Sequence, residues 1–243
     1  MATATASKIP FPFCDMHSHL LPGVDDGCKT AEESLALLRQ SAAQGIDGVF
    51  VTPHFYPERS LSQFLSARGK ALETLRAAVP AGEALPPIRP GAEVAYYPGL
   101  QDIERLPSLC LGNTPFLLLG LPFYPWSRNL LRDVEALQSY FGIRLVIAHV
   151  DRYLDSQDGS LIRQLLDSDV YFQMNAEAVL SPHTARKARR LLKDGYISFL
   201  GSDCHDPERR RQLLGEAVDK ICSWRMEETV RAIGAFSCQL FER

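Results

Sequence analysis

Five histidines stand in similar places along this chain of 243 residues, at the end of a short apolar run or just beyond it. They are His17, His19, His54, His149 and His205. Histidine is seldom fully buried without a partner for its ring, so the repeated placement indicates a use for the imidazoles. Because residues two apart on a strand face the same side, we expect His17 and His19 to point together.

Three carboxylates lie in comparable places, namely Asp26, Glu93 and Asp203. Mixed nitrogen and oxygen ligands without thiolate suit manganese, iron or zinc better than calcium or an iron–sulfur cluster. The five imidazoles and three carboxylates together exceed the ligands that one ion takes, so the sequence predicts a centre of two or three divalent ions. Such ions would also relieve the repulsion among the carboxylates.

The segments that hold these residues alternate in character. Seven apolar runs predict strands at 13–19, 46–52, 88–94, 116–121, 143–149, 170–175 and 197–202. Apolar residues at helical spacing predict helices after an N-cap at Thr30, and at 61–75, 130–141, 161–167, 184–193 and 208–223. This alternation predicts a parallel sheet, and seven units favour a closed α/β barrel with its chemistry at the strand C-termini. A doubly wound open sheet is the alternative, although no glycine-rich nucleotide motif supports it.

Composition narrows the functional classes. The net charge of −3 gives no electrostatic reason to expect nucleic acid or an anionic membrane as a partner. No apolar run approaches the roughly 20 residues of a membrane span, and the first ten residues lack the apolar core of a secretory signal. The six cysteines form no C-x-x-C pair, so a reducing cytoplasm is the expected location. We expect a single domain at 13–243, preceded by an N-terminal tail at 1–12.

Five motifs give the chain a family resemblance: DMHSHLLPGVDDG (15–27), TPH (52–54), GAEV (91–94), IAHVDRY (147–153) and GSDCH (201–205). In this order they resemble the PHP (polymerase and histidinol phosphatase) superfamily. More narrowly, they resemble the bacterial metal-dependent protein-tyrosine phosphatases of capsule and exopolysaccharide operons. The resemblance implies a distorted (β/α)7 TIM-like barrel and a trinuclear Mn²⁺ centre, with Fe or Zn as alternatives. The implied partner is a phosphotyrosine-containing protein, such as a bacterial tyrosine autokinase, with neither nucleic acid nor a membrane span involved.

The resemblance also implies roles for individual residues. One ion would be held by His17, His19, Glu93 and Asp203, a second by Glu93 and His149, and a third by Asp26, His54 and His205. Arg152 and Arg210 match arginines that bind the substrate phosphate. His205 or His54 would position water, and the sequence does not choose between them.

One position departs from the family pattern. The family has a glutamate at the end of the fourth strand, as a ligand of the second ion, and this chain has Gly120 there. We therefore expect the second ion to be the weakest held of the three.

Two other functions stay open at this stage. One is a PHP phosphoesterase for a small molecule such as histidinol phosphate or a nucleotide, and the other is a degenerate PHP protein with little or no turnover. Cys204 and Arg210 also satisfy the C-x5-R pattern of cysteine-dependent phosphatases. The intervening HDPER does not suit a phosphate cradle, because it has no glycine, two carboxylates that repel anions, and a proline without an N–H.

Overall fold

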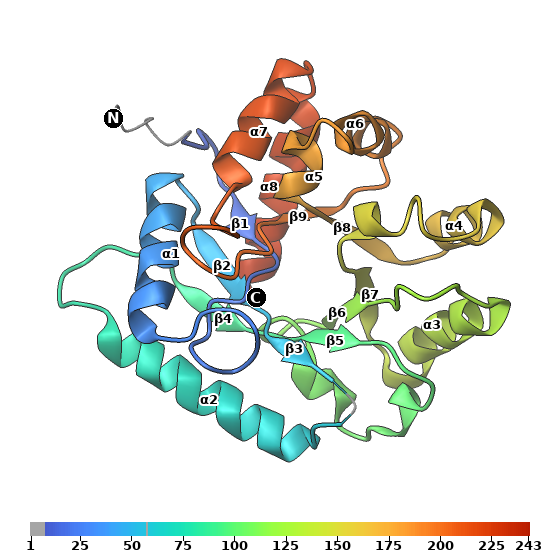
Figure 1. Ribbon diagram of the computed structural model, residues 1–243, viewed down its shortest axis with the longest axis horizontal. Helices are drawn as coiled ribbons and strands as arrows, with labels where there is room; N and C mark the ends of the chain where they lie inside the picture. Colours follow the sequence, from blue (N-terminus) through green and yellow to red (C-terminus); the bar gives the residue numbers. More distant parts are fainter. Residues whose placement is uncertain (1–7, 57) are drawn as a thin grey trace.

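The computed structural model describes residues 8–56 and 58–243, and Figure 1 shows its strands at the centre with helices around them. The strands are β1 (Cys14–Asp15), β2 (Gly48–Val51), β3 (His54–Phe55), β4 (Ile88–Pro90), β5 (Glu93–Ala95), β6 (Phe116–Gly120), β7 (Arg144–Ile147), β8 (Tyr171–Asn175) and β9 (Phe199–Gly201). They form two parallel sheets with the orders β1-β2-β4 and β3-β5-β6-β7-β8-β9. Each of the seven predicted segments contains a strand, so that prediction is confirmed.

Prolines interrupt the strands just beyond the second of these segments and within the third. β3 lies outside the predicted segments and is separated from β2 by Thr52 and Pro53, while β4 ends at Pro90 and is separated from β5 by Gly91 and Ala92. Proline has no backbone N–H to donate to a ladder, so regular pairing is interrupted at each point. The chain passes from the three-stranded to the six-stranded sheet at both places.

The two ends of the strand order, β1 and β9, meet through the residues that follow them. Ser18 forms an isolated parallel bridge with Cys204. The N–H of His19 donates to the carbonyl of Cys204 at 2.9 Å, and the N–H of Asp203 donates to the carbonyl of His17 at 2.8 Å. The curled sheets confirm a distorted barrel in a single α/β domain. The contacts that close it between the segments after β1 and β9 involve the predicted ligands His17, His19 and Asp203.

The helices are α1 (Ala31–Ala43), α2 (Leu61–Ala78), α3 (Arg128–Phe141), α4 (Gly159–Leu166), α5 (Ala176–Leu180), α6 (Ala185–Lys193), α7 (Leu214–Ser223) and α8 (Glu227–Glu242), with 3-10 turns η1 (Leu100–Asp102), η2 (Leu106–Leu109) and η3 (Val150–Arg152). Thr30 caps α1 as predicted, because its side chain accepts from the N–H of Glu33. The predicted start of a helix at 208 is wrong. The Asp206 carboxylate accepts from the N–H groups of residues 208, 209 and 210, which holds a turn there, and α7 begins only at Leu214.

Helix α8, which the helical patterns did not include, covers the N-terminal ends of the strands. Phe236 packs against the rings of Phe116, Tyr171 and Phe199, the first residues of β6, β8 and β9. Its buried face includes Gly234 and Ser237, which break up the apolar stripe that would reveal a helix in the sequence. α8 therefore seals one end of the barrel and leaves the C-terminal strand ends as the open end.

Two sequence expectations concern the termini and membranes. Residues 1–7 of the expected tail lie outside the described residues, while Ile9 and Phe11 are buried in the core, so the boundary at residue 13 stays a prediction. None of the helices within residues 8–56 and 58–243 combines the length and apolar character that a bilayer crossing requires.

Candidate metal centre and its cavity

Two histidines and two carboxylates converge just beyond β1. The Nε2 atoms of His17 and His19 lie 3.0 Å apart, and both side chains are fully buried. Oε2 of Glu93 lies 3.1 Å from Nε2 of His17 and 3.4 Å from Nε2 of His19. Oδ1 of Asp203 lies 3.7 Å and 3.4 Å from the same two nitrogens. Four ligand-type atoms, from the segments after β1 and β9 and from the start of β5, thus point at one small volume, as a metal site requires.

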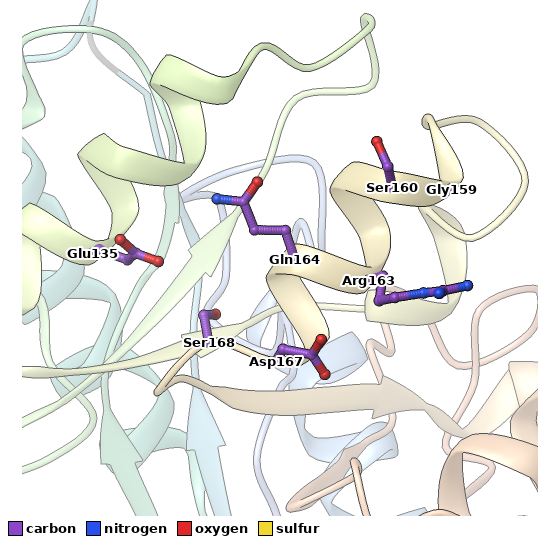
Figure 2. Close-up of a pocket in the computed structure, with 7 residues that line it drawn as sticks. All are labelled: Glu135, Gly159, Ser160, Arg163, Gln164, Asp167 and Ser168. Carbon is purple, nitrogen blue, oxygen red and sulfur yellow. The ribbon is translucent and has the colours of Figure 1, made fainter.

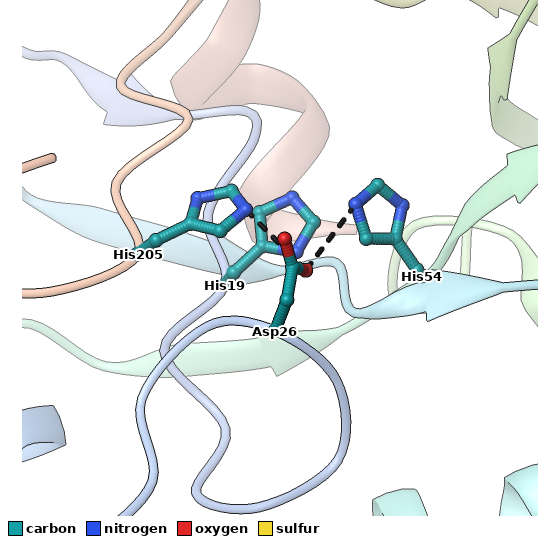
Figure 3. A group of neighbouring side chains, drawn as sticks. All are labelled: His19, Asp26, His54 and His205. Atoms are coloured by element: carbon teal, nitrogen blue, oxygen red, sulfur yellow. Dashed lines mark ion pairs between the residues drawn. The ribbon is translucent and has the colours of Figure 1, made fainter.

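A second group adjoins the first through His19. Its members are His19, Asp26, His54 and His205 (Figure 3), and one ligand atom from each lies within 4.8 Å of the others. Oδ1 of Asp26 lies 3.5 Å from Nε2 of His54 and 3.6 Å from Nε2 of His205. Nε2 of His205 is buried and has no hydrogen-bond partner. A buried nitrogen without a partner is costly, and a cation bound among these ligands would satisfy it, so the donor set fits a divalent ion.

His149 joins Glu93 from the other side. Its Nε2 atom lies 2.7 Å from Oε1 of Glu93, and its backbone is left-handed with φ of 35°. Gly120, at the end of β6, lies beside this pair, and a Cβ built on it would sit 2.9 Å from Oε1 of Glu93. The predicted second site therefore has Glu93 and His149 in place, with no side chain at Gly120 to complete it.

Electrostatics of the buried group follow from burial and from pairing. Burial alone would raise the pKa of Glu93, but His17 and His149 outweigh it and hold that pKa well below its usual range. Burial alone would lower the pKa of His19, but hydrogen bonds to Asp203 and Asp25 raise it well above its usual range. Burial prevails for His205, whose pKa falls to about 4. Without an ion the site balances its carboxylates with imidazolium, so an ion would have to displace protons from imidazoles.

Two arginines reach the same carboxylate. Arg152 in η3 donates to Oδ2 of Asp203 at 2.6 Å, and Arg210 lies 2.9 Å from that oxygen. Their side chains are 35% and 41% exposed, so their remaining donors face the cavity above the ligands. Guanidinium groups bind phosphate in a planar, charge-assisted geometry, which suits both residues to an anionic substrate.

The cavity has a volume of about 460 Å³ and is lined by both arginines and five predicted ligands together with aromatic side chains. Phe123 is exposed and stacks on His149, with ring centroids 6.2 Å apart and planes 19° apart. Tyr56 is exposed and stacks on His54 at 5.1 Å. Trp126 is instead buried and donates from its indole to the carbonyl of Pro122, so it packs the loop. The exposed rings therefore stand at the edge of this cavity.

The cysteine alternative has no support in this geometry. Cys204 is fully buried, and burial raises its pKa well above the usual range. It does not line the cavity, and its i+6 partner Arg210 is engaged with Asp203. A buried protonated thiol is a poor nucleophile, so the C-x5-R pattern is coincidental.

Three polar residues of the site were missed from the sequence. Asp25 accepts from Nδ1 of His19 at 2.6 Å and from the N–H of His54 at 2.9 Å; these contacts outweigh burial and lower its pKa to about 2. Gln173 and Asn175 on β8 are buried beside His17 and Asp203. The available signals were the doubled aspartate of DDG and two amides, two residues apart, in an otherwise apolar run.

A larger hollow lies elsewhere, on the outside of the barrel between α3 and α4 (Figure 2). It measures about 700 Å³ and is lined by Glu135, Gly159, Ser160, Arg163, Gln164, Asp167 and Ser168. These are mostly surface side chains of mixed charge, and none is a predicted site residue. We therefore place the candidate site in the smaller cavity at the strand ends.

Comparisons with known proteins agree with this geometry. Residues 13–236 match the model of a family described as "Capsular polysaccharide synthesis, CpsB/CapC". Tyrosine-protein phosphatase CpsB of Streptococcus agalactiae is 28% identical over 232 residues, which cover 86% of this chain and 89% of that protein. CpsB of Streptococcus pneumoniae is 29% identical over 225 residues, covering 85% and 88%. Tyrosine-protein phosphatase YwqE of Bacillus subtilis is 26% identical over 213 residues, covering 84% and 82%.

A solved structure shares the fold over nearly its whole length. It belongs to the crystal structures of YwqE from Bacillus subtilis and CpsB from Streptococcus pneumoniae, described as unique metal-dependent tyrosine phosphatases. The match has a TM-score of 0.80 at 22% identity and covers 95% of this chain and 94% of the other.

Proposed function

This chain belongs to the CpsB/CapC family of capsular polysaccharide synthesis proteins, and from that premise we propose that it is a metal-dependent protein-tyrosine phosphatase. It would hydrolyse a phosphomonoester of tyrosine in a protein. The observation that carries the proposal is the convergence of His17, His19, Glu93 and Asp203 in one buried group, with Arg152 in the same cavity.

We propose as metal ligands the residues whose nitrogen and oxygen atoms converge in the site. His17, His19, Glu93 and Asp203 would hold one ion, Glu93 and His149 a second, and Asp26, His54 and His205 a third. Divalent ions bound there would supply Lewis acidity and a water of lowered pKa at neutral pH. We propose Mn²⁺, with Fe or Zn as alternatives, because the ligand set has no thiolate.

The arginines would bind the phosphate. Asp203 holds both guanidinium groups at the mouth of the cavity, because its Oδ2 atom accepts a hydrogen bond from Arg152 and forms an ion pair with Arg210. An incoming phosphate would accept hydrogen bonds from donors that do not face Asp203. Positive charge at this position stabilises the phosphoryl oxygens as charge redistributes during transfer.

The proposed reaction needs little general-acid catalysis from the protein. A tyrosinate leaving group has a conjugate acid near pKa 10, so it departs without strong acid help. Burial lowers the pKa of both His54 and His205, which favours neutral rings that can ligate an ion and so hold its bound water in position. We propose this role for His205 or His54, with no choice between them.

The exposed rings support an aromatic substrate over a small polar one. Phe123 and Tyr56 stand on either side of the ligands and leave an open mouth that a side chain on a protein surface could enter. A phosphotyrosine-containing protein, such as a bacterial tyrosine autokinase, is the partner we propose. We also propose a reducing cytoplasm, which the free state of the described cysteines supports.

A direct assay tests the proposal. Purified protein should release phosphate from a phosphotyrosyl peptide with Mn²⁺ present, and release should stop with a chelator and return with added Mn²⁺. Histidinol phosphate and a nucleoside monophosphate, assayed in parallel, should be hydrolysed at least tenfold less efficiently. Faster hydrolysis of either would favour the small-molecule phosphoesterase, and no hydrolysis of any substrate would favour a binding protein without turnover.

A further inference from the structure

Two amide side chains on β8 connect three of the proposed ligands. Gln173 and Asn175 are two residues apart on the strand and are almost fully buried. β8 lies between β7 and β9, the strands that lead to His149 and Asp203 (Figure 1). The oxygen of each amide already accepts a hydrogen bond from a protein N–H, so their burial at this position calls for a role other than that of a ligand.

The hydrogen bonds form one continuous chain. Oε1 of Gln173 accepts from the backbone N–H of His149 at 2.7 Å and lies 3.2 Å from Nδ1 of His17. Nε2 of Gln173 donates to Oδ1 of Asn175 at 2.9 Å. Nδ2 of Asn175 then donates to Oδ2 of Asp203 at 2.8 Å.

The direction of this chain is fixed at both ends. The N–H of His149 can only donate, so the oxygen of Gln173 must face it. The carboxylate of Asp203 can only accept, so the nitrogen of Asn175 must face it. Neither amide can flip without setting two acceptors or two donors against each other.

The fixed direction selects the tautomer of His17. An amide oxygen is an acceptor, so Nδ1 of His17 must hold a proton that it donates to Gln173. The lone pair of the neutral ring then lies on Nε2, which faces His19, Glu93 and Asp203. A metal-ligating histidine commonly has its orientation and tautomer fixed in this way by the partner of its other nitrogen.

The backbone near Gln173 leaves space for this chain of hydrogen bonds. A Cβ on Gly201 would lie 2.6 Å from Cβ of His17 and 2.7 Å from Nε2 of Gln173, so only glycine fits there. His149 has φ of 35°, a conformation that non-glycine residues seldom adopt, and Gln173 holds its N–H. The side chain of Gln173 therefore fixes where His149 enters the site.

We infer that Gln173 and Asn175 are positioning residues, which set the tautomer of His17 and the orientation of His149 and Asp203 so that a divalent ion binds. This inference rests on the metal centre proposed above. Partners of this kind typically contribute about 10–100-fold to metal affinity.

Metal affinity measured on metal-stripped protein tests the inference. Gln173→Met removes the acceptor and the donor, and it should weaken Mn²⁺ binding about 10–100-fold in a calorimetric or chelator-competition titration. Gln173→Glu keeps the acceptor for His17 and His149, so it should bind Mn²⁺ at least tenfold more tightly than Gln173→Met. The matched control is Gln44→Met, because Gln44 is also buried and bonded through both amide atoms, but to Gln212 and Gly215 away from the ligands. It should lower the melting temperature and leave Mn²⁺ affinity unchanged.

A spectroscopic readout complements the titration. In protein labelled with ¹⁵N-histidine and loaded with diamagnetic Zn²⁺, NMR should find His17 protonated at Nδ1. A proton on Nε2 would overturn the inference, as would equal Mn²⁺ affinity in wild type and Gln173→Met. If Gln173→Met does not fold, Asn175→Leu takes its place, and wild-type affinity in that variant overturns the inference. A wild type that binds no divalent ion would instead refute the metal centre itself.

Discussion

Arg152 and Asp203 are paired at 2.6 Å, although they follow different strands, β7 and β9. The pair connects Arg152, which would bind phosphate, with Asp203, which would bind metal. Asp203 presents one oxygen to the histidines and the other to the arginines, so its negative charge offsets part of the positive charge of both. Any change at Arg152 can therefore act on phosphate binding, on Asp203, or on both, and the measurements must separate the two.

The Arg152→Ala variant should lower kcat/KM for a phosphotyrosyl peptide about ten- to a hundredfold. A charge-assisted hydrogen bond in a partly dry site is worth about 1.5–3 kcal/mol, which gives this range. Metal content measured by mass spectrometry should stay at the wild-type value, because three other ligands hold the ion near Asp203. Arg163→Ala, on the outer surface of α4, serves as the control and should behave as wild type. Unchanged kinetics in Arg152→Ala would remove this residue from phosphate binding.

The His17→Ala variant should lose activity by more than a hundredfold, together with at least one bound ion. His17 is fully buried and faces His19, Glu93 and Asp203, so no solvent-exposed side chain can replace it. His183→Ala is the matched control, because His183 is the histidine that lies outside the site and is exposed. Activity that persists in His17→Ala, or in the presence of a strong chelator, would contradict a metal-dependent mechanism.

Substitutions of Gly120 test how the second ion is held. In Gly120→Ala, the new Cβ would press on Oε1 of Glu93, which His149 already holds at 2.7 Å, so metal affinity should fall. Gly120→Glu introduces the same crowding but adds a carboxylate, so it should bind Mn²⁺ more tightly than Gly120→Ala and raise the stoichiometry at low Mn²⁺. Titrations of all three proteins check this. Three fully occupied ions in the wild type, or no advantage of the Glu variant over the Ala variant, would show that the second ion needs no ligand from this position.

The Phe123→Ala variant should raise KM for a phosphotyrosyl peptide about two- to tenfold, with little change in kcat. Phe123 is exposed and stacked on His149, so an aromatic substrate would lose a ring contact of about 0.5–1.5 kcal/mol. Tyr124→Ala makes a useful control, because Tyr124 is equally exposed but does not line the cavity. An equal change for a non-aromatic phosphomonoester would argue that Phe123 shapes the loop and does not contact the substrate ring.

The sequence predicted the strands well, and it singled out candidate ligands that the structure brings together, because both depend on local patterns. A buried parallel strand is a short apolar run, and the histidines and carboxylates follow such runs directly. The break at Pro53 and the turn around Asp206 were missed although both are local, because apolar periodicity does not reveal a missing proline N–H or a carboxylate that bonds to the N–H groups of its own turn. Helix α8 was missed because Gly234 and Ser237 occupy part of its buried face.

The residues that support the candidate ligands were harder to predict than the candidate ligands themselves. Asp25 and Asp26 are adjacent in the DDG triplet, and only folding shows that Asp25 bonds to His19 while Asp26 faces His54 and His205. Gln173 and Asn175 look like polar interruptions of a strand until His17 and Asp203 are brought next to them from distant parts of the chain. Their role depends on tertiary contacts across at least 24 residues of sequence, which no local pattern contains.

The position of α8 has a consequence for how the barrel forms during synthesis. The rings of Phe116, Tyr171 and Phe199 at the strand starts are covered by Phe236, which follows all the strands in the chain. Until α8 has left the ribosome, those rings and the N-terminal end of the barrel stay open to water. The nascent chain must therefore hold an incomplete barrel through most of its translation, and we expect a chaperone that shields apolar surface to bind it during that interval.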